Sequence, residues 1–178
     1  MPPQPADSRI LRLEELAPTT PEPALAQARD LVVEYGRFVI AQPGAARFCF
    51  GSLEKEAARL PTSYHEQGGG SLLALVNEEP AGFIAWRALA PSPAVVPDAW
   101  ELKRLWVRPV ARGLGLGRLL TQSVLDRAIA ADRKAVYLDT APAAMAAAHR
   151  VYLDLGFQAC SVYNDNPVEG IIFLVKFL

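Results

Sequence analysis

Residues 101–120, ELKRLWVRPVARGLGLGRLL, combine a strand, a tight turn and the start of a helix. The apolar, β-prone run ends at Pro109, which cannot donate a backbone hydrogen bond to a neighbouring strand. Three glycines in five positions, flanked by Arg112 and Arg118, then lead into a helical pattern. The first N–H groups of a helix lack intrahelical partners, and glycines let the backbone close around a ligand. The stretch therefore predicts an anion-binding turn, with a phosphate or pyrophosphate as the expected ligand.

Two common phosphate-binding motifs do not fit this turn. The dinucleotide fingerprint requires glycines at the first, third and sixth positions, but the sixth position counted from Gly113 is Arg118. A P-loop ends in Gly-Lys-Ser/Thr, whereas Gly117 is followed here by Arg118 and Leu119. A glycine-rich connection without a ligand is the alternative that the turn alone leaves open.

Hydrophobic periodicity extends the pattern in both directions along the chain. Helical spacing predicts helices over about residues 22–41, 52–60, 115–131 and 142–154. Strands are predicted over about residues 71–77, 81–89, 100–107, 135–140, 157–163 and 170–177, with one more strand ahead of the first helix. The strand–helix–strand unit requires a parallel, right-handed crossover, whereas the hairpins are antiparallel. We therefore expect an α/β (α+β) fold with a mixed sheet and helices on both faces.

The composition is that of an ordinary globular chain. Its 178 residues suffice for one domain with a buried core, so we expect a single domain over residues 1–178, with the proline-rich residues 1–8 as a loose tail. The net charge of -1 gives no reason to expect nucleic-acid binding. No apolar run approaches the ~18–20 residues that span a bilayer, and no signal peptide is recognised. We expect a cytoplasmic protein with neither a nucleic acid nor a membrane as partner.

The cysteines and histidines are few and scattered. Cys49 and Cys160 lie far apart, neither belongs to a CxxC pair, and only His65 and His149 could serve as further ligands. This pattern favours neither a zinc site nor a disulfide framework. Both cysteines are expected to be small buried apolar side chains.

The glycine turn and a later segment resemble one known family. Within RGLGLG, Arg112, Gly115 and Gly117 match the R/Q-x-x-G-x-G/A motif of the GNAT superfamily of acyl-CoA-dependent N-acyltransferases. The block 101–120 is similar to the family's strand–turn–helix segment, and AHRVYLDLGF, residues 148–157, is similar to its later helix. The resemblance covers most of the chain. Within the family, the chain resembles a bacterial subgroup whose substrate is unassigned. It implies a mostly antiparallel sheet of six to seven strands in which one parallel pair splays apart.

The resemblance also implies acetyl-CoA as the acyl donor, with no metal. In this family the pyrophosphate rests on the N–H groups of the glycine turn, and the pantetheine arm lies along the edge of the preceding strand. The implied donor-binding residues are Leu105, Trp106, Val107, Arg112, Gly113, Leu114, Gly115, Leu116, Gly117 and Arg118. One position departs from the family: Met145 stands where relatives often carry an asparagine that touches the pantetheine arm.

Two residues are predicted to carry the chemistry. Tyr152 matches the family's tyrosine by its spacing to Gly156 and Phe157, and it is predicted to be the general acid for the CoA thiolate. With an ordinary pKa of about 10, a tyrosine can donate a proton at pH 7. Glu101 is predicted to be the general base, acting through a water, because relatives often carry a carboxylate there. A packing role for Tyr152 and a structural ion pair for Glu101 are the alternatives.

The acceptor is predicted to be a primary amine of a small molecule, and Tyr64, Arg87 and Arg104 are predicted to contact it. Strand alternation places Glu101 and Lys103 on one face and Arg104 on the other, unless a bulge intervenes. Packing of Tyr64 and surface positions for the arginines are the alternatives. For the protein as a whole, the alternatives are acetylation of a protein or peptide amine and a non-catalytic acyl-CoA sensor. Homodimer formation is compatible with the family.

Overall fold

The computed structural model describes residues 10–42, 50–166 and 168–178, and of Phe50 only the backbone. The predicted tail, residues 1–8, and Cys49 lie outside the described residues. Cys160 is half-buried rather than buried. It follows the short strand β6 (Gln158–Ala159), where the chain leaves the sheet.

The fold is built on one seven-stranded sheet with the order β1-β2-β3-β4-β5-β7-β6. Its remaining strands are β1 (Leu11–Glu15), β2 (Gly70–Val76), β3 (Glu79–Leu89), β4 (Ala99–Val107), β5 (Ala135–Thr140) and β7 (Ile172–Phe177). All neighbouring strands pair antiparallel except β4 and β5. The mixed, mostly antiparallel sheet with one parallel pair confirms the predicted fold class.

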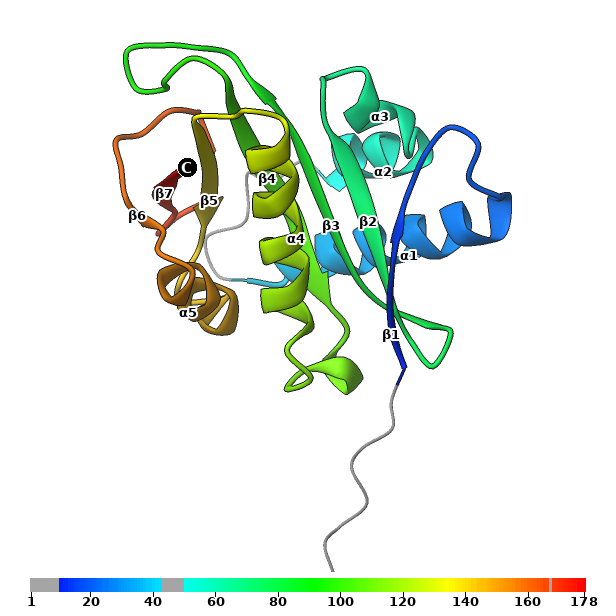
Figure 1. Ribbon diagram of the computed structural model, residues 1–178. Coiled ribbons are helices and arrows are strands. Elements are labelled where there is room, and N and C mark those ends of the chain that lie inside the picture. The colour runs from blue at the N-terminus through cyan, green and yellow to red at the C-terminus, as the bar shows by residue number, and fades with distance from the viewer. Residues whose placement is uncertain (1–9, 43–49, 167) are drawn as a thin grey trace, which may run out of the picture.

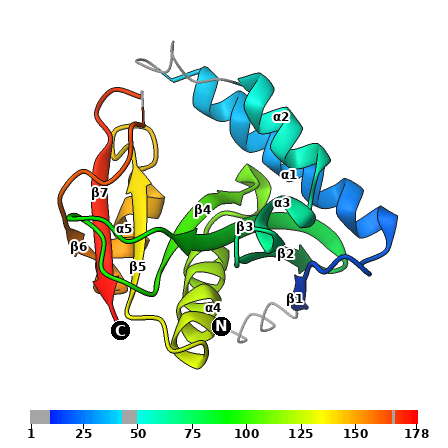
Figure 2. The same ribbon diagram turned by 90° about the horizontal axis from the view of Figure 1, so that it is seen from above.

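Helices cover both faces of the sheet. Figures 1 and 2 show α1 (Glu22–Ile40) and α2 (Phe50–Ala58) on one side and α4 (Leu116–Ala130) on the other. The helix α5 (Ala146–Asp154) contacts α4, and its Tyr152 belongs to the same hydrophobic cluster as the buried side chains of α4. The chain therefore forms three layers. On the α1–α2 side of the sheet, these two helices do not cover the β5–β7 end, where a loop lies instead.

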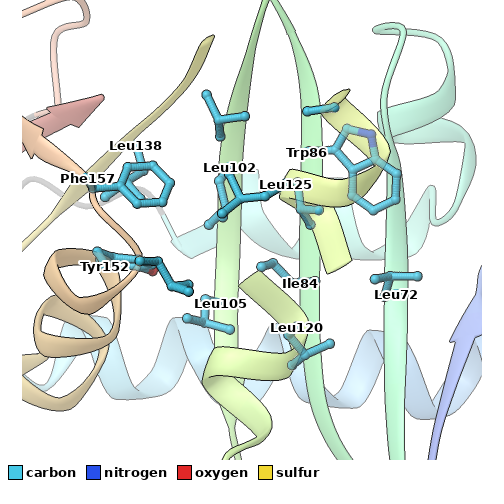
Figure 3. Packing of buried hydrophobic residues seen from close by; sticks show 14 of the residues in the cluster. Leu72, Ile84, Trp86, Leu102, Leu105, Leu120, Leu125, Leu138, Tyr152 and Phe157 are labelled. Atoms are coloured by element: carbon cyan, nitrogen blue, oxygen red, sulfur yellow. The ribbon is translucent and has the colours of Figure 1, made fainter. Parts of the chain in front are cut away.

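The hydrophobic cluster under α4 and α5 joins five strands, β2, β3, β4, β5 and β7, to these helices. Figure 3 shows Leu102 and Leu105 of β4 between the α4 side chains and those of α5 and β5. Tyr152 extends from α5 toward Leu105 in this view. Tyr152, which is predicted to be catalytic, is thus held in place by packing within this cluster.

The parallel pair β4–β5 is short. Only Ala99–Glu101 pair with Ala135–Tyr137, and beyond Glu101 the two strands separate. Figure 2 shows β5 and β7 turned away from the direction of β3 and β4. The edge of β4 that carries Leu105 to Val107 is therefore free of β5, as the resemblance implied.

A bulge interrupts β4 at Arg104. Lys103 pairs with Ala85 and Trp106 pairs with Phe83, so β4 has one residue more than β3 between these two pairs. Arg104 absorbs the extra residue with a left-handed backbone (φ 58). Its guanidinium consequently reaches α2 on the face that Lys103 also uses, and the alternation that placed Arg104 on the opposite face is wrong.

Three segments differ from the predicted boundaries. The predicted loop after α2 contains a short helix, α3 (Thr62–His65). The helix α5 begins at Ala146 rather than near 142, because the N–H groups of Ala144 and Met145 both donate to the Ala141 carbonyl in a turn. The strand β6 is only two residues long, because the chain after it bends back to hydrogen-bond Glu101.

Candidate functional site

The glycine turn presents a row of free backbone donors. Gly113 and Gly115 have left-handed backbones (φ 83 and 77), which only glycine adopts without strain. Gly115 caps α4 without a side-chain hydrogen bond. Within the described part of the chain, none of the six N–H groups from Gly113 to Arg118 has a hydrogen-bond acceptor. Together with the positive end of the α4 dipole, they form an anion-binding cradle.

This cradle opens into a cavity of about 460 Å³, which we call the donor cavity. Its walls come from the β4 edge, the glycine turn, the start of α5 and one side chain of α1. The lining residues are Phe38, Leu105, Trp106, Val107, Ala111, Arg112, Gly113, Gly115, Leu116, Gly117, Arg118, Ala144, Met145, Ala146, Ala147, Ala148 and Val151. Nine of the ten predicted donor-binding residues are among them. The tenth, Leu114, packs against the hydrophobic cluster instead.

The two arginines of the turn differ in how they are held. The Arg112 guanidinium lies 5.3 Å from the centre of the Trp106 ring, and its Nε donates to the Val107 carbonyl at 3.3 Å. Both Arg112 and Arg118 are exposed. The positive charge of Arg112 is therefore fixed at the edge of β4, where the cradle meets the free strand edge.

A second cavity of about 230 Å³, the acceptor cavity, lies where β4 and β5 separate. Its walls come from α1, the β4 bulge, β5 and the following turn, α5 and the loop ahead of β7. The lining residues are Tyr35, Phe38, Val39, Gln42, Leu102, Lys103, Arg104, Leu105, Asp139, Thr140, Ala141, Ala143, Ala144, Met145, Tyr152, Asn166, Val168, Glu169, Gly170 and Ile171. Phe38, Leu105, Ala144 and Met145 line both cavities, so the two adjoin.

Tyr152 lies on the wall of the acceptor cavity and is 3% exposed. Its ring packs edge-on against Phe157 at 5.7 Å between centres. Burial raises the pKa of the Tyr152 hydroxyl well above its usual value, and nearby Tyr35 and Asp139 raise it further. The side chain is therefore a neutral phenol at pH 7, a form that can donate a proton.

Glu101 lies in the sheet with no exposed surface and lines neither cavity. Its Oε2 accepts from Arg87 Nε at 2.7 Å, and its Oε1 accepts from Lys103 Nζ at 3.3 Å. Tyr163 Oη and Asn164 Nδ2 also donate to Oε1, at 3.1 and 3.2 Å. Burial raises the pKa of Glu101, but Lys103 and Arg87 outweigh that effect and hold it below its usual value. The group is a charged anchor that ties β3, β4 and the loop after β6 together.

Arg104 and Tyr64 meet at a second carboxylate, the half-buried Glu56 of α2. Arg104 Nε and Nη2 each donate to Glu56 at 2.9 Å, and Tyr64 Oη donates to the same carboxylate. The Arg104 guanidinium also lies 5.7 Å from the centre of the Tyr35 ring. Arg104 lines the acceptor cavity, whereas Tyr64 is buried at 2% exposure and lines neither cavity.

The structure brings together only part of the predicted acceptor and catalytic set. Tyr152 and Arg104 face the acceptor cavity, while Arg87, Tyr64 and Glu101 stand behind it. Asp139 is a cavity residue that the sequence analysis missed. Its signal was present: a carboxylate stands at the end of the otherwise apolar strand AVYLDT.

Two kinds of site are not found in the described ranges. No group of three or more His, Cys, Asp or Glu side chains there could hold a metal ion. None of the helices described is both long enough and apolar enough to cross a membrane.

Comparison with known proteins gives a consistent result. The model of the acetyltransferase (GNAT) family matches residues 38–157. An uncharacterised N-acetyltransferase of Schizosaccharomyces pombe is 33% identical over 78 residues, which are 44% of this chain and 47% of the yeast protein. The match thus spans about half the length of that relative.

Solved structures match over nearly the whole chain. An acetyltransferase from Streptococcus agalactiae has a TM-score of 0.71 at 22% identity and covers 94% of this chain and 98% of its own. The acetyltransferase YncA of Salmonella typhimurium, solved with acetyl-CoA, has a TM-score of 0.63 at 16% identity and covers 96% of this chain and 94% of its own. At these identities the likeness establishes a shared fold.

Proposed function

Because the chain belongs to the acetyltransferase (GNAT) family, whose members are acyltransferases that use acetyl-CoA, we propose that it acetylates a primary amine of a small molecule. The observation that carries this proposal is the pair of adjoining cavities. One is lined by free backbone donors and the other by charged side chains and Tyr152, and they share four residues. Such a pair can hold an acyl donor and an acceptor next to each other.

The donor cavity has the chemistry that a CoA pyrophosphate requires. Six free N–H groups and two arginines favour a doubly charged phosphate group. A Cβ added at Gly113, Gly115 or Gly117 would meet no atom within 4 Å, so the inner surface of the turn is open. The free edge at Leu105 to Val107 can pair with the amides of the pantetheine arm. We assign this cavity to acetyl-CoA.

Tyr152 is proposed as the general acid. Acetyl-CoA supplies a thioester whose carbonyl carbon the neutral amine attacks, forming an N–C bond while the C–S bond breaks. Tyr152 gives its proton to the departing sulfur, and the proton that the acylated nitrogen loses replaces it. Its hydroxyl is protonated at pH 7, the form that a general acid requires. Tyr152 lies on the wall of the acceptor cavity, to which Ala144 and Met145 also contribute, and these two residues line the donor cavity as well. This position supports the role.

Glu101 as general base remains a prediction. Its carboxylate is connected to the acceptor cavity through Lys103, which lines that cavity, and through Asn164, which donates to both Glu101 and the cavity residue Asp139. If Glu101 is the base, Glu101→Gln should lower kcat at pH 7, and the loss should shrink at high pH, where the amine loses its proton unaided. If it is an anchor, the loss should be the same at every pH and should accompany lower stability.

An amine panel with acetyl-CoA tests the function. Acetyl-CoA should raise the melting temperature, and free thiol should appear only when a small primary amine is present. Stabilisation with no thiol release for any small amine or peptide would indicate a sensor instead. Thiol release with peptides alone would move the acceptor to protein amines. A cytoplasmic location and homodimer formation also remain predictions.

A further inference from the structure

Asp139 lies on the wall of the acceptor cavity, and only one of its two carboxylate oxygens accepts a hydrogen bond from the residues described. Its Oδ2 accepts from Asn164 Nδ2 at 2.7 Å and lies 3.8 Å from Lys103 Nζ. Its Oδ1 has no hydrogen-bond donor among the residues described. The side chain is 13% exposed, so the free oxygen belongs to a site that is only partly open to water.

Its position contrasts with that of Glu101, only one strand away. Both oxygens of Glu101 are occupied, by Arg87 on one side and by Lys103, Tyr163 and Asn164 on the other. Glu101 has no exposed surface, whereas Asp139 lines the cavity. Of these two carboxylates, only Asp139 can accept a further hydrogen bond from a molecule in the cavity.

A second polar group on the same wall is unpartnered. Thr140 follows Asp139 at the end of β5, is 3% exposed and lines the acceptor cavity. Its hydroxyl oxygen has no hydrogen-bond partner among the described residues. A buried hydroxyl without a partner is costly in a folded protein, and a ligand on this wall would relieve that cost.

The two cations of the cavity are already engaged. Arg104 is held by two hydrogen bonds to Glu56, and Lys103 lies closer to Glu101 than to Asp139, at 3.3 against 3.8 Å. Glu169, on the opposite loop, lines the cavity and has no ion pair within the described ranges. The groups left to meet a small molecule are therefore mainly carboxylates.

We propose that Asp139 binds the ammonium group of the acceptor and takes one of its protons on Oδ1 before the neutral nitrogen attacks the thioester. The enzyme accordingly selects small cationic amines over neutral or carboxylate-bearing ones. The proposal rests on the assignment of this cavity to an amine acceptor. An ammonium hydrogen-bonded to Oδ1 would lie on the wall that also carries Tyr152. Asp139 and Tyr152 interact electrostatically, since the charge of Asp139 contributes to the raised pKa of Tyr152. The acceptor would thus be held next to the proposed proton donor.

Substitution of Asp139 with asparagine isolates its charge. The amide keeps the shape and can still accept from Asn164, so the loop ahead of β7 should stay in place. For ethylamine, ethanolamine and putrescine, kcat/KM of D139N should fall about 10- to 100-fold relative to the wild type, because a hydrogen bond between charged groups is lost. For methoxyamine, which matches ethylamine in size but is neutral at pH 7, kcat/KM should change less than threefold.

Asp165→Asn is the matched control. Asp165 is exposed on the neighbouring loop and lines neither cavity, so this variant makes the same charge change and should behave as the wild type with every amine. The melting temperature and the acetyl-CoA dissociation constant should be unchanged in both variants. This readout separates a loss of acceptor recognition from a loss of folding or donor binding.

Two outcomes would overturn the assignment, and a third would overturn the proposed function on which it rests. Equal loss of activity of D139N on ethylamine and methoxyamine would show that the charge does not select the acceptor. A wild-type preference for β-alanine over ethylamine would point to Arg104 and Lys103 as the recognition groups. If the wild type acetylates no amine although acetyl-CoA raises its melting temperature, the proposed function itself fails, which is a result independent of Asp139.

Discussion

The donor and acceptor cavities adjoin, but they are made in different ways. The donor cavity owes its charge complementarity to backbone N–H groups of six consecutive residues, and few of its side chains are polar. The acceptor cavity owes its character to charged side chains from β4, β5 and the loop ahead of β7, and the two from β4 are held by Glu101 and Glu56 behind its wall. A backbone site depends on the conformation of a single turn. A side-chain site depends on a network, and a change anywhere in that network alters it.

This difference predicts where substitutions should act. Changes behind the acceptor wall should disturb stability and acceptor use together while sparing acetyl-CoA binding. Changes in the glycine turn should weaken acetyl-CoA binding and spare acceptor use. Four variants test this separation.

The largest effect is expected for Glu101→Gln. The change leaves the cations of Arg87 and Lys103 without their shared counter-charge, and breaking a buried ion pair costs about 3 kcal/mol or more of the free energy of unfolding. The folded pKa of Glu101 lies below its unfolded value of about 4.3, so its contribution is complete above that pH and is lost as the pH falls through the folded pKa. The stability gap between wild type and variant should therefore be wider at pH 7 than at pH 3.

Denaturant unfolding at the two pH values measures this gap. Glu15→Gln serves as the control, since Glu15 pairs with Arg127 at 2.8 Å on the surface and is 50% exposed. Its loss should cost at most about 1 kcal/mol. A gap for Glu101→Gln that does not change with pH would mean that the charge of Glu101 is not what stabilises the fold.

Tyr152→Phe should give the next largest effect. The variant keeps the ring that packs against Phe157 and removes only the hydroxyl. Loss of a general acid lowers kcat by about 100-fold or more, with little change in the melting temperature or in acetyl-CoA affinity. Steady-state kinetics across pH would check this. An unchanged kcat and an unchanged pH profile would remove Tyr152 from the acid role.

The smallest effects are expected in the turn, from Gly115→Ala and Gly117→Ala. Alanine at Gly115 must adopt a left-handed backbone, which costs about 1–2 kcal/mol of stability. Gly117 lies in the first turn of α4 with open space around it, so alanine there should add up to about 0.5–1 kcal/mol to the stability of the free protein. Both variants should bind acetyl-CoA more weakly, because the new methyl group stands at the cradle.

Thermal melting with and without acetyl-CoA separates the two contributions. Gly117→Ala should raise the melting temperature of the free protein and reduce the increase caused by acetyl-CoA. If it binds acetyl-CoA as tightly as the wild type does, the pyrophosphate does not rest on this turn.

The donor half of the site could be predicted from sequence because its determinants are local. The stop at Pro109, the glycine spacing and the start of α4 lie in one continuous stretch, and nine of its ten predicted residues line the donor cavity. The boundaries of α1 and β5 followed in the same way from hydrophobic periodicity. The family resemblance added the expectation that β4 and β5 separate.

The acceptor half could not be predicted, because it depends on long-range pairing. A one-residue bulge, which no local pattern signalled, turns Arg104 toward α2 and brings it to Glu56, 48 residues earlier in the chain. Glu101 stood at the expected strand position, but the partners that bury it come from residue 87 and from residues 163 and 164. Spacing along the chain carries no information about such contacts, and the cavity role of Asp139 emerges only when they are known.

The four residues that line both cavities have a thermodynamic consequence. Phe38, Leu105, Ala144 and Met145 form a common wall, so a ligand that shifts any of them on one side changes the binding surface on the other. Binding of the two substrates is then linked, and the linkage is reciprocal: whatever factor acetyl-CoA imposes on the affinity for the amine, the amine imposes on the affinity for acetyl-CoA. Because the two cavities share this wall, the protein can couple the binding of its two ligands without any further conformational change.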